Sequence, residues 1–347
     1  MKIKFYDASV IYKEIYEREK SALTAHAEAA EPCETTALFE RDMARYLEAE
    51  KTIACASYEN ACDALFSALL SAGDTVVATV FCKCREAIER CGAEIVFADT
   101  EPVTFNISAA AVLSAVTEKT RAVVVTDMAG QTGEYEKLAE VLKDKNIYLI
   151  EEATEALCSH RICGDKICRA GSFCDAGLIS FAPGADFAAE EEYGLIVLPK
   201  AHEYDKGVAE KAAEPDHEQS ALLRARLRSC EEWAENRRVL AERYMFMLGE
   251  NALYRRITPS SEAEYNRHVY NSYTLLAENR DGLYRYLAEH GVETVRPEIQ
   301  LSPEASEKLP ASSAYIKNAI SLPIYKGLTA VQQEKIISLI ADFYKES

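Results

Sequence analysis

The cysteines are the first residues to consider for chemistry in this chain, because several of them lie close together in the sequence. The chain contains 11 cysteines, and four of them in its middle part are separated by runs of four, four and five residues, with His160 among them. Thiolates and imidazoles hold Zn²⁺ or iron–sulfur clusters, but such sites favour cysteine pairs about two to four residues apart on tight turns. We therefore predict free thiols and no metal site. The cysteines concerned are Cys158, Cys163, Cys168 and Cys174, with Cys82 and Cys84 further upstream.

The cysteine count also bears on the cellular compartment. An odd number of cysteines, scattered from Cys33 to Cys230, does not suit the disulfide framework of a secreted protein. The N-terminal residues lack the apolar segment of a signal peptide, and no apolar stretch is long enough to cross a bilayer. We therefore predict a cytoplasmic protein with reduced thiols.

The net charge argues against two classes of partner. The chain has 57 acidic and 39 basic side chains, which gives a net charge of −18. A nucleic-acid-binding surface needs basic residues that displace counterions from phosphates, and binding to an anionic membrane needs them as well. The composition therefore predicts neither a nucleic acid nor a membrane as a partner.

Short apolar runs alternate with amphipathic helices over the first half of the chain. Runs such as Ala122–Val125 indicate strands buried on both faces, and the helices between them predict a mostly parallel sheet in an α/β domain. Strand-like segments without helices predict an antiparallel stretch between residues 158 and 196. The expected helices are 7–31, 38–50, one running through 65–70, 85–91, 108–116, 135–142, 217–249, 281–289 and 329–345; the expected strands are 75–79, 94–98, 122–126, 147–151, 177–181, 195–198, 269–276 and 320–323.

Five segments in the same order resemble the nucleotide-sugar aminotransferases of the DegT/StrS type, from about residue 35 to 345. They are 97–107, 119–131, 149–156, 171–181 and 322–329. The resemblance implies an α/β protein with the type I fold of transferases that depend on pyridoxal phosphate (PLP). Its large domain, expected at 1–213, would hold a mostly parallel seven-stranded sheet, and 214–347 would form a long connecting helix and a smaller α+β domain. Such proteins are normally dimers that transfer an amino group to a keto group of a nucleotide-linked sugar.

The resemblance places the Schiff-base lysine of PLP chemistry at residue 185, where this chain has alanine. The segment 180–194 aligns without gaps and is anchored by Ser180-Phe181 at its start and by Gly194 at its end. No lysine lies between Lys166 and Lys200. Alanine has neither a lone pair nor a transferable proton, so Ala185 cannot form an aldimine.

The other residues implied by the resemblance also depart from the family's pattern. Glu152 aligns with the carboxylate that binds the ring nitrogen of PLP, although it could equally be solvated or paired with a surface base. The phosphate-binding helix start falls at Ser57–Asn60, with a register uncertain by one residue. Ser57 is expected to cap the helix. Glu59 would put a negative charge beside the phosphate, or would simply interact favourably with the helix dipole.

Two further positions are ambiguous. Lys83 stands where the family has the aromatic ring that stacks on the cofactor, and a relocated aldimine lysine is the less favoured interpretation. His268 matches a histidine that lies near the sugar nucleotide in the family, or it is an ordinary edge-strand histidine. The segment 210–215 does not match the asparagine and arginine that the second subunit supplies in the family, so the arginine that would bind the carboxylate of the amino donor is missing at that place. The vestigial cofactor pocket thus comprises Ser57, Glu59, Asn60, Lys83, Glu152, Glu155, Ser180 and Ala185.

The sequence therefore favours a catalytically degenerate member of this family, with no catalytic residue and no cofactor. Such a protein would bind a sugar nucleotide or a related ligand, either as a homodimer or in a heterodimer with an active paralogue. The alternative is an active transaminase that uses PLP or pyridoxamine phosphate with non-standard residues and acts on a nucleotide-linked sugar.

Overall fold

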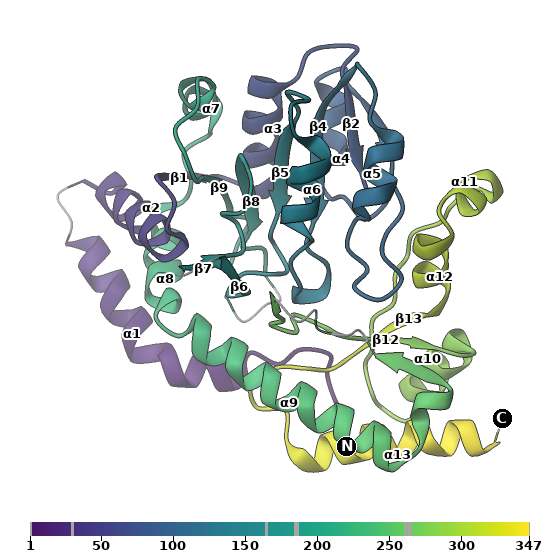
Figure 1. Cartoon of the computed structure of the whole chain (residues 1–347). Helices are drawn as coiled ribbons and strands as arrows, with labels where there is room; N and C mark the ends of the chain where they lie inside the picture. Colours follow the sequence, from purple (N-terminus) through teal and green to yellow (C-terminus); the bar gives the residue numbers. More distant parts are fainter. Residues whose placement is uncertain are drawn as a thin grey trace.

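The computed structural model describes residues 2–28, 31–163, 166–183, 187–259, 262 and 266–346. A seven-stranded sheet forms its centre, with the strand order β1-β9-β8-β5-β4-β2-β3 (Figure 1). Neighbours from β3 to β8 run parallel, whereas β9 is antiparallel to both β8 and β1. This confirms the mostly parallel sheet and the antiparallel stretch after residue 158. The strands are β1 (Lys51–Cys55), β2 (Thr75–Ala78), β3 (Glu94–Phe97), β4 (Thr120–Thr126), β5 (Tyr148–Glu152), β8 (Ala176–Ser180) and β9 (Gly194–Leu198).

Helices cover both faces of this sheet, which explains the uninterrupted apolar runs of its strands. Alternate residues of β4 point to opposite sides, because Val124 packs with α3 and α4 whereas Val123 packs with α5 and α6. The apolar faces of these helices pack against the sheet. Among the described residues, no helix is long and apolar enough to cross a bilayer. The covering helices are α2 (Cys33–Leu47), α3 (Tyr58–Leu69), α4 (Arg85–Arg90), α5 (Ala109–Ala115), α6 (Tyr135–Leu142), α7 (Asp205–Lys211) and α8 (His217–Leu227).

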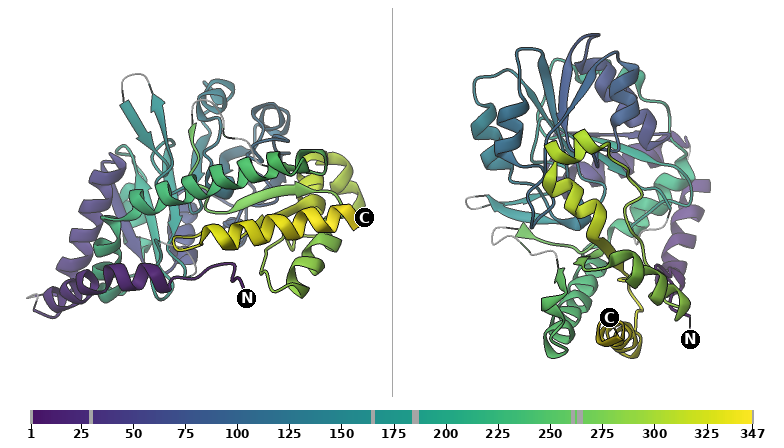
Figure 2. Two further views of the ribbon diagram at one scale, coloured as in Figure 1. Left: turned by 90° about the horizontal axis from the view of Figure 1, so that it is seen from below. Right: turned by 90° about the vertical axis from the view of Figure 1, so that its right-hand side faces the viewer.

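The C-terminal part has a core of its own, built on a three-stranded antiparallel sheet in the order β10-β12-β13. α9 and α13 run side by side against it (Figure 2). Ile3 joins this core and pairs with Val292 through a parallel bridge. The elements are β10 (Ile257–Pro259), β12 (Tyr273–Ala277), β13 (Ala319–Leu322), α9 (Cys230–Glu250), α10 (Arg280–Glu289), α11 (Pro303–Lys308), α12 (Pro310–Asn318) and α13 (Ala330–Glu346). α1 (Ser9–Ala27) packs on α8, and β6 (His160–Cys163), β7 (Lys166–Arg169) and β11 (Asn266–Arg267) form a small third sheet.

Two of the expected elements are wrong. The single helix over 217–249 is two helices, α8 and α9, and no proline or glycine marks the break; instead Arg18 Nη1 donates to Ser229 Oγ at 2.8 Å beside it. The strand expected from residue 269 begins only at Tyr273, because Tyr270 has a left-handed backbone with φ of 47°. The domain boundary after residue 213 stays a prediction, since α9 contributes Ala234 to the core of the large sheet and Tyr244 to the C-terminal core.

Candidate cofactor and ligand site

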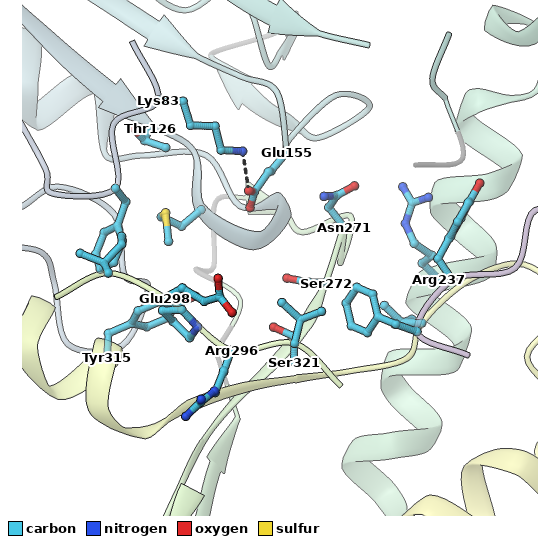
Figure 3. Close-up of a pocket in the computed structure, with 18 residues that line it drawn as sticks. Lys83, Thr126, Glu155, Arg237, Asn271, Ser272, Arg296, Glu298, Tyr315 and Ser321 are labelled. Atoms are coloured by element: carbon cyan, nitrogen blue, oxygen red, sulfur yellow. Dashed lines mark hydrogen bonds and ion pairs between the residues drawn. The ribbon is translucent and has the colours of Figure 1, made fainter. Parts of the chain in front are cut away.

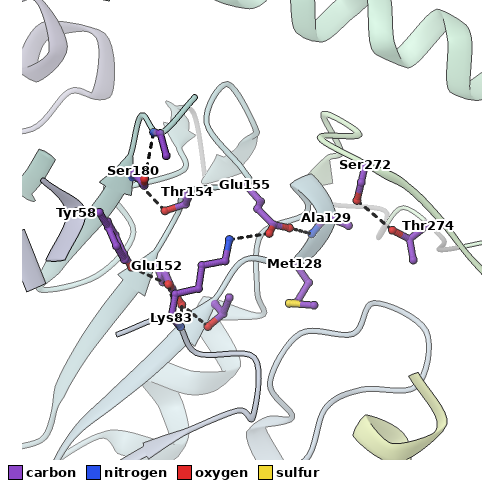
Figure 4. Close-up of polar contacts among 12 residues, drawn as sticks. Tyr58, Lys83, Met128, Ala129, Glu152, Thr154, Glu155, Ser180, Ser272 and Thr274 are labelled. Carbon is purple, nitrogen blue, oxygen red and sulfur yellow. Dashed lines mark hydrogen bonds and ion pairs between the residues drawn. The ribbon is translucent and has the colours of Figure 1, made fainter. Parts of the chain in front are cut away.

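The carboxyl ends of β2, β4, β5 and β8 meet at one edge of the large sheet, where ligands bind in open α/β folds. Of the residues predicted from the sequence, Lys83, Glu152, Glu155 and Ser180 lie at this edge, and α3 begins there with Ser57 as its cap (Figure 4). Ala185 lies outside the described residues. The structure thus brings most of the predicted pocket together.

Glu152 ends β5 and is buried, with only 1% of its surface exposed. Its Oε1 accepts a hydrogen bond from the Tyr58 hydroxyl at 2.7 Å, and its Oε2 accepts one from Thr126 Oγ1 at 2.7 Å. The backbone N–H of Lys83 lies 3.2 Å from both oxygens. The interpretation of Glu152 as a solvated or surface-paired carboxylate is therefore wrong, because all of its partners are buried or half-buried groups of this edge.

Tyr58 is the residue of the site that the sequence reasoning missed. It is the first residue of α3, and its hydroxyl contacts Glu152 (Figure 4). The same hydroxyl lies 3.1 Å from the sulfur of Cys84. Burial, followed by the neighbouring Cys84 and Glu152, raises the pKa of Tyr58 well above its ordinary value, so the phenol keeps its proton and donates it. Tyr58 thereby connects the start of α3 with the carboxylate at the end of β5.

We expect Tyr58→Phe to lower the free energy of unfolding by about 1–3 kcal/mol, because the buried Glu152 loses one of its donors without gaining another. Urea unfolding curves of the variant and of the wild type measure this difference. Tyr16→Phe is the matched control, since Tyr16 is 58% exposed and its loss should change stability by less than about 0.5 kcal/mol. Equal midpoints for Tyr58→Phe and the control would contradict the importance of the contact.

The start of α3 is organised by local contacts. Ser57 Oγ accepts a hydrogen bond from Asn60 N at 3.0 Å, which confirms Ser57 as the helix cap. Asn60 Oδ1 accepts from Ala213 N at 2.7 Å and so holds the segment between α7 and α8. The side chain of Glu59 is 66% exposed and forms an ion pair with Arg90 of α4 at 2.9 Å. Of the two roles considered for Glu59, this exposed position favours the interaction with the helix dipole.

Lys83 and Glu155 form an ion pair within the site, with 2.8 Å between Lys83 Nζ and Glu155 Oε1. Glu155 Oε2 also accepts from Ala129 N at 2.9 Å. Burial alone would lower the pKa of Lys83, but the charges of Glu155 and Glu152 outweigh it and raise that pKa above its ordinary value. In Glu155, burial is likewise outweighed by Lys83, and its pKa is lowered. Both side chains are therefore charged, and Lys83 is held as an ammonium ion.

A cavity of about 370 Å³ lies between this edge and the C-terminal sheet (Figure 3). Lys83 and Glu155 line it from the large sheet, Arg237 lines it from α9, and Arg296 lines it from the C-terminal part. Aromatic rings complete the wall, and Phe81 packs edge-on against Tyr315 at 5.1 Å between ring centres. An adjoining cavity of about 140 Å³ shares Lys83, Glu155 and Arg237 with the first and reaches Ser180. The site is therefore a cleft with cationic and aromatic walls.

His268 is fully buried and lines neither cavity. Its Nδ1 accepts a hydrogen bond from Tyr270 N at 2.9 Å, and its ring stacks on that of Tyr270 at 4.0 Å. Burial, together with Arg238 and Arg237, lowers the pKa of His268 to about 3, so the imidazole is neutral. It follows β11 in a loop, so neither predicted role, as a sugar contact or as an edge-strand residue, matches its position.

The cysteines of the middle part are dispersed within the described residues. The thiol of Cys158 lies within hydrogen-bonding range of Cys230 at the start of α9, whereas Cys174 lies near Asp127 and Glu151. The side chain of Cys163 is outside the described part of the chain. A different set of groups gathers at the sheet edge, where ligand atoms of Cys82, Cys84 and Glu152 lie within 4.8 Å of one another.

The sheet order, the helices on both faces and the cleft at the carboxyl edge define the class of protein. A solved aminotransferase of the DegT DnrJ EryC1 StrS type from Brucella abortus has the same fold, with a TM-score of 0.84, 24% identity and coverage of 98% of both chains. This confirms the type I fold of PLP-dependent aminotransferases.

The sequence comparisons then fix the family. The profile of the DegT/DnrJ/EryC1/StrS aminotransferase family matches residues 13–209 and 216–341. A curated relative, the "Pleiotropic regulatory protein" of Geobacillus stearothermophilus, is 31% identical over 339 residues, which cover 88% of each chain. The GDP-perosamine synthase of Caulobacter vibrioides is 26% identical over 343 residues, 87% of this chain and 88% of its own. The chain belongs to the DegT/DnrJ/EryC1/StrS aminotransferase family.

Proposed function

We propose that this chain is a catalytically degenerate member of its family, which binds a nucleotide-linked sugar or a related ligand in the cleft without transferring an amino group. The observation that carries the proposal is the 2.7 Å hydrogen bond between Tyr58 and Glu152. In this bond, Tyr58 of the same chain donates to the carboxylate that, according to the resemblance, would bind the ring nitrogen of PLP.

The described residues do not fit PLP at its ring end. The resemblance would direct the phosphate to the start of α3 and the ring nitrogen to Glu152. Tyr58 is the first residue of α3, so its backbone lies where the phosphate would be directed, and its hydroxyl reaches Glu152 (Figure 4). Its phenol ring therefore lies along the path that the cofactor would follow, and cofactor and phenol would compete for the same carboxylate.

The lysine requirement is not met either. Alanine stands at residue 185 in the sequence, and Lys83 is the only lysine among the described residues that line the two cavities. An aldimine forms from a neutral amine, whereas Lys83 is held as an ammonium ion by Glu155 at 2.8 Å. Both features support a site that lacks a covalently bound cofactor.

The ligand class and the assembly are part of the proposal. The name of the Caulobacter relative refers to a GDP-linked sugar, and the cleft of this chain offers groups that suit such a ligand. Arg237, whose Nε donates to Val269 O, and Arg296, which also pairs with Asp281, are the arginines that could bind a diphosphate. Tyr315 and Phe81 supply apolar rings for a base or a sugar. We propose a cytoplasmic homodimer, or a heterodimer with an active paralogue.

Incubation with PLP followed by borohydride reduction tests this function. Reduction fixes an aldimine irreversibly on its lysine, and intact-mass spectrometry with peptide mapping detects the adduct. We expect no stoichiometric adduct on this chain and one adduct per chain on Spr1654 of Streptococcus pneumoniae, a protein of this fold that has been solved in a PLP form and is treated in parallel as the positive control. Calorimetric titration with a GDP-linked sugar should, in contrast, show binding. A stoichiometric PLP adduct on any lysine of this chain would overturn the proposal.

The second candidate is an active transaminase with non-standard residues, and the name of the Caulobacter relative as a synthase favours it. It requires a lysine that can form the aldimine, so the same reduction experiment separates the two functions. Under this candidate, the protein would be yellow when loaded with PLP, and the adduct would map to one lysine, most simply Lys83.

A further inference from the structure

Three thiols and a carboxylate converge at the ring end of the site. Cys82 and Cys84 lie on the turn after β2, Glu152 ends β5, and the ligand atoms of these three residues lie within 4.8 Å of one another. Cys62 of α3 is a neighbour of Cys84 and packs in the same core. Cys62 and Cys84 are 2% and 1% exposed, respectively. Residues from three separate elements thus present soft ligand atoms to one buried point.

Packing alone gives a weak reason for this arrangement. A thiol is a poor hydrogen-bond donor and acceptor, and isolated buried cysteines are normally dispersed as small apolar side chains. Here the thiols face one another, a buried carboxylate and the Tyr58 hydroxyl, which lies 3.1 Å from Cys84 Sγ. Such a concentration of acceptor atoms is what a cation would satisfy.

We propose that Cys82, Cys84 and Glu152 form a site for a thiophilic divalent cation, in the first place Zn²⁺, and that Cys62 moves in as the fourth ligand. Tetrahedral zinc with Zn–S bonds of about 2.3 Å brings sulfur ligands about 3.8 Å apart, so the three groups whose ligand atoms lie within 4.8 Å of one another need only small side-chain adjustments, whereas Cys62 lies outside that group and needs a larger one. Glu152 can bind through one lone pair of Oε1 while the other still accepts the hydrogen bond from Tyr58, and its Oε2 keeps the hydrogen bond from Thr126.

The surroundings of the site are compatible with a bound cation. Cysteine binds Zn²⁺ as a thiolate, so binding releases protons. The N-terminus of α3, where Tyr58 contacts both Cys84 and Glu152, favours the negative charge that thiolate and carboxylate ligands bring.

Metal retention by the full-length protein tests the site. The protein is stripped with a chelator under reducing conditions, given excess Zn²⁺, desalted and analysed for bound metal; Cd²⁺ in a parallel sample reports thiolate ligation through its ultraviolet charge-transfer band. We expect about one Zn²⁺ per chain, the cadmium–thiolate band, and a higher melting temperature with Zn²⁺. Cys84→Ser should lose the metal and all three signals.

The matched control is Cys91→Ser. Cys84 directly precedes α4 and Cys91 directly follows it, but Cys91 belongs to no group of candidate ligands among the described residues. This variant should therefore bind Zn²⁺ like the wild type. If Cys84→Ser does not fold, Cys82→Ser is the second variant, because Cys82 is only partly buried. Equal zinc retention by the wild type and by a folded Cys82→Ser or Cys84→Ser variant would overturn the proposal, as would the absence of Zn²⁺ uptake by the reduced wild type. These outcomes are independent of PLP trapping on a lysine, which tests the proposed function.

Discussion

Gly194→Ala is expected to destabilise the protein by about 3 kcal/mol or more. Gly194 begins β9, where a Cβ atom would lie 2.4 Å from the carbonyl oxygen of Ser57 and 2.9 Å from Tyr58 Cα. These are backbone atoms at the start of α3, so they cannot rotate away. The methyl group would push the helix start from the sheet and weaken the contact between Tyr58 and Glu152.

Urea unfolding measures this loss, and Gly207→Ala is its matched control. Gly207 lies inside α7, where a Cβ atom would meet Ala68 Cβ at 3.8 Å, an ordinary contact. Alanine there should stabilise the protein by about 0.5–1 kcal/mol, because it restricts the unfolded chain and favours the helix. If the midpoint of Gly194→Ala equals that of the wild type, α3 and β9 are not packed as closely as the structure describes.

The elements that could be predicted from the sequence are those whose environment leaves a local pattern. The run Ala122–Val125 is predictable as a strand because both of its faces are buried. Ser57 is predictable as a helix cap because its partner Asn60 is only three residues away. The break between α8 and α9 has no such pattern, because the contact of Ser229 with Arg18 joins residues far apart in the sequence.

The candidate site shows the same limit. Glu152 and Lys83 were placed through the resemblance, but the partner of Glu152 is Tyr58, 94 residues away in the sequence, and no periodicity connects them. The outward direction of Glu59 could have been inferred from helix phase: Asp63 lies one turn further on the same face, and both carboxylates bind Arg90. The convergence of the thiols could not, because α3 and the turn after β2 meet only in the fold.

The second large effect is a dependence of the folding stability on pH. It arises from two neighbouring buried carboxyl groups, those of Asp127 and Glu151. Asp127 Oδ1 accepts hydrogen bonds from Gly133 N at 2.9 Å and from the Tyr135 hydroxyl at 2.7 Å. Glu151 accepts from Gly171 N at 2.6 Å and from Phe173 N at 2.9 Å. Burial, and then the charge of Glu151, raises the pKa of Asp127 well above its ordinary value; burial also raises that of Glu151 to about 7. Asp127 therefore keeps its proton, although its Oδ2 has no hydrogen-bond partner among the described residues.

Stability should accordingly fall as the pH rises. The folded protein holds protons that the unfolded chain releases near the ordinary carboxyl pKa of 4.5, so the stabilisation is complete below that value and is lost as the pH rises through about 7. We expect a loss on the order of 3 kcal/mol between about pH 5 and about pH 8. Urea unfolding curves across this range measure it.

Asp127→Asn should remove the share of this pH dependence that comes from Asp127, while the share from Glu151 stays, because burial is the first cause of its raised pKa. The asparagine Oδ1 can keep the bonds from Gly133 and Tyr135, and the asparagine side chain has no carboxyl proton to lose. The variant should match the wild type within about 1 kcal/mol near pH 5 and exceed it by roughly 2 kcal/mol near pH 8. Glu94→Gln, which removes an exposed carboxylate from β3, is the control and should keep the slope of the wild type. An Asp127→Asn variant that is less stable than the wild type near pH 8 would mean that the pair is ionised and stabilising there, because losing that charge would then cost the fold a favourable interaction.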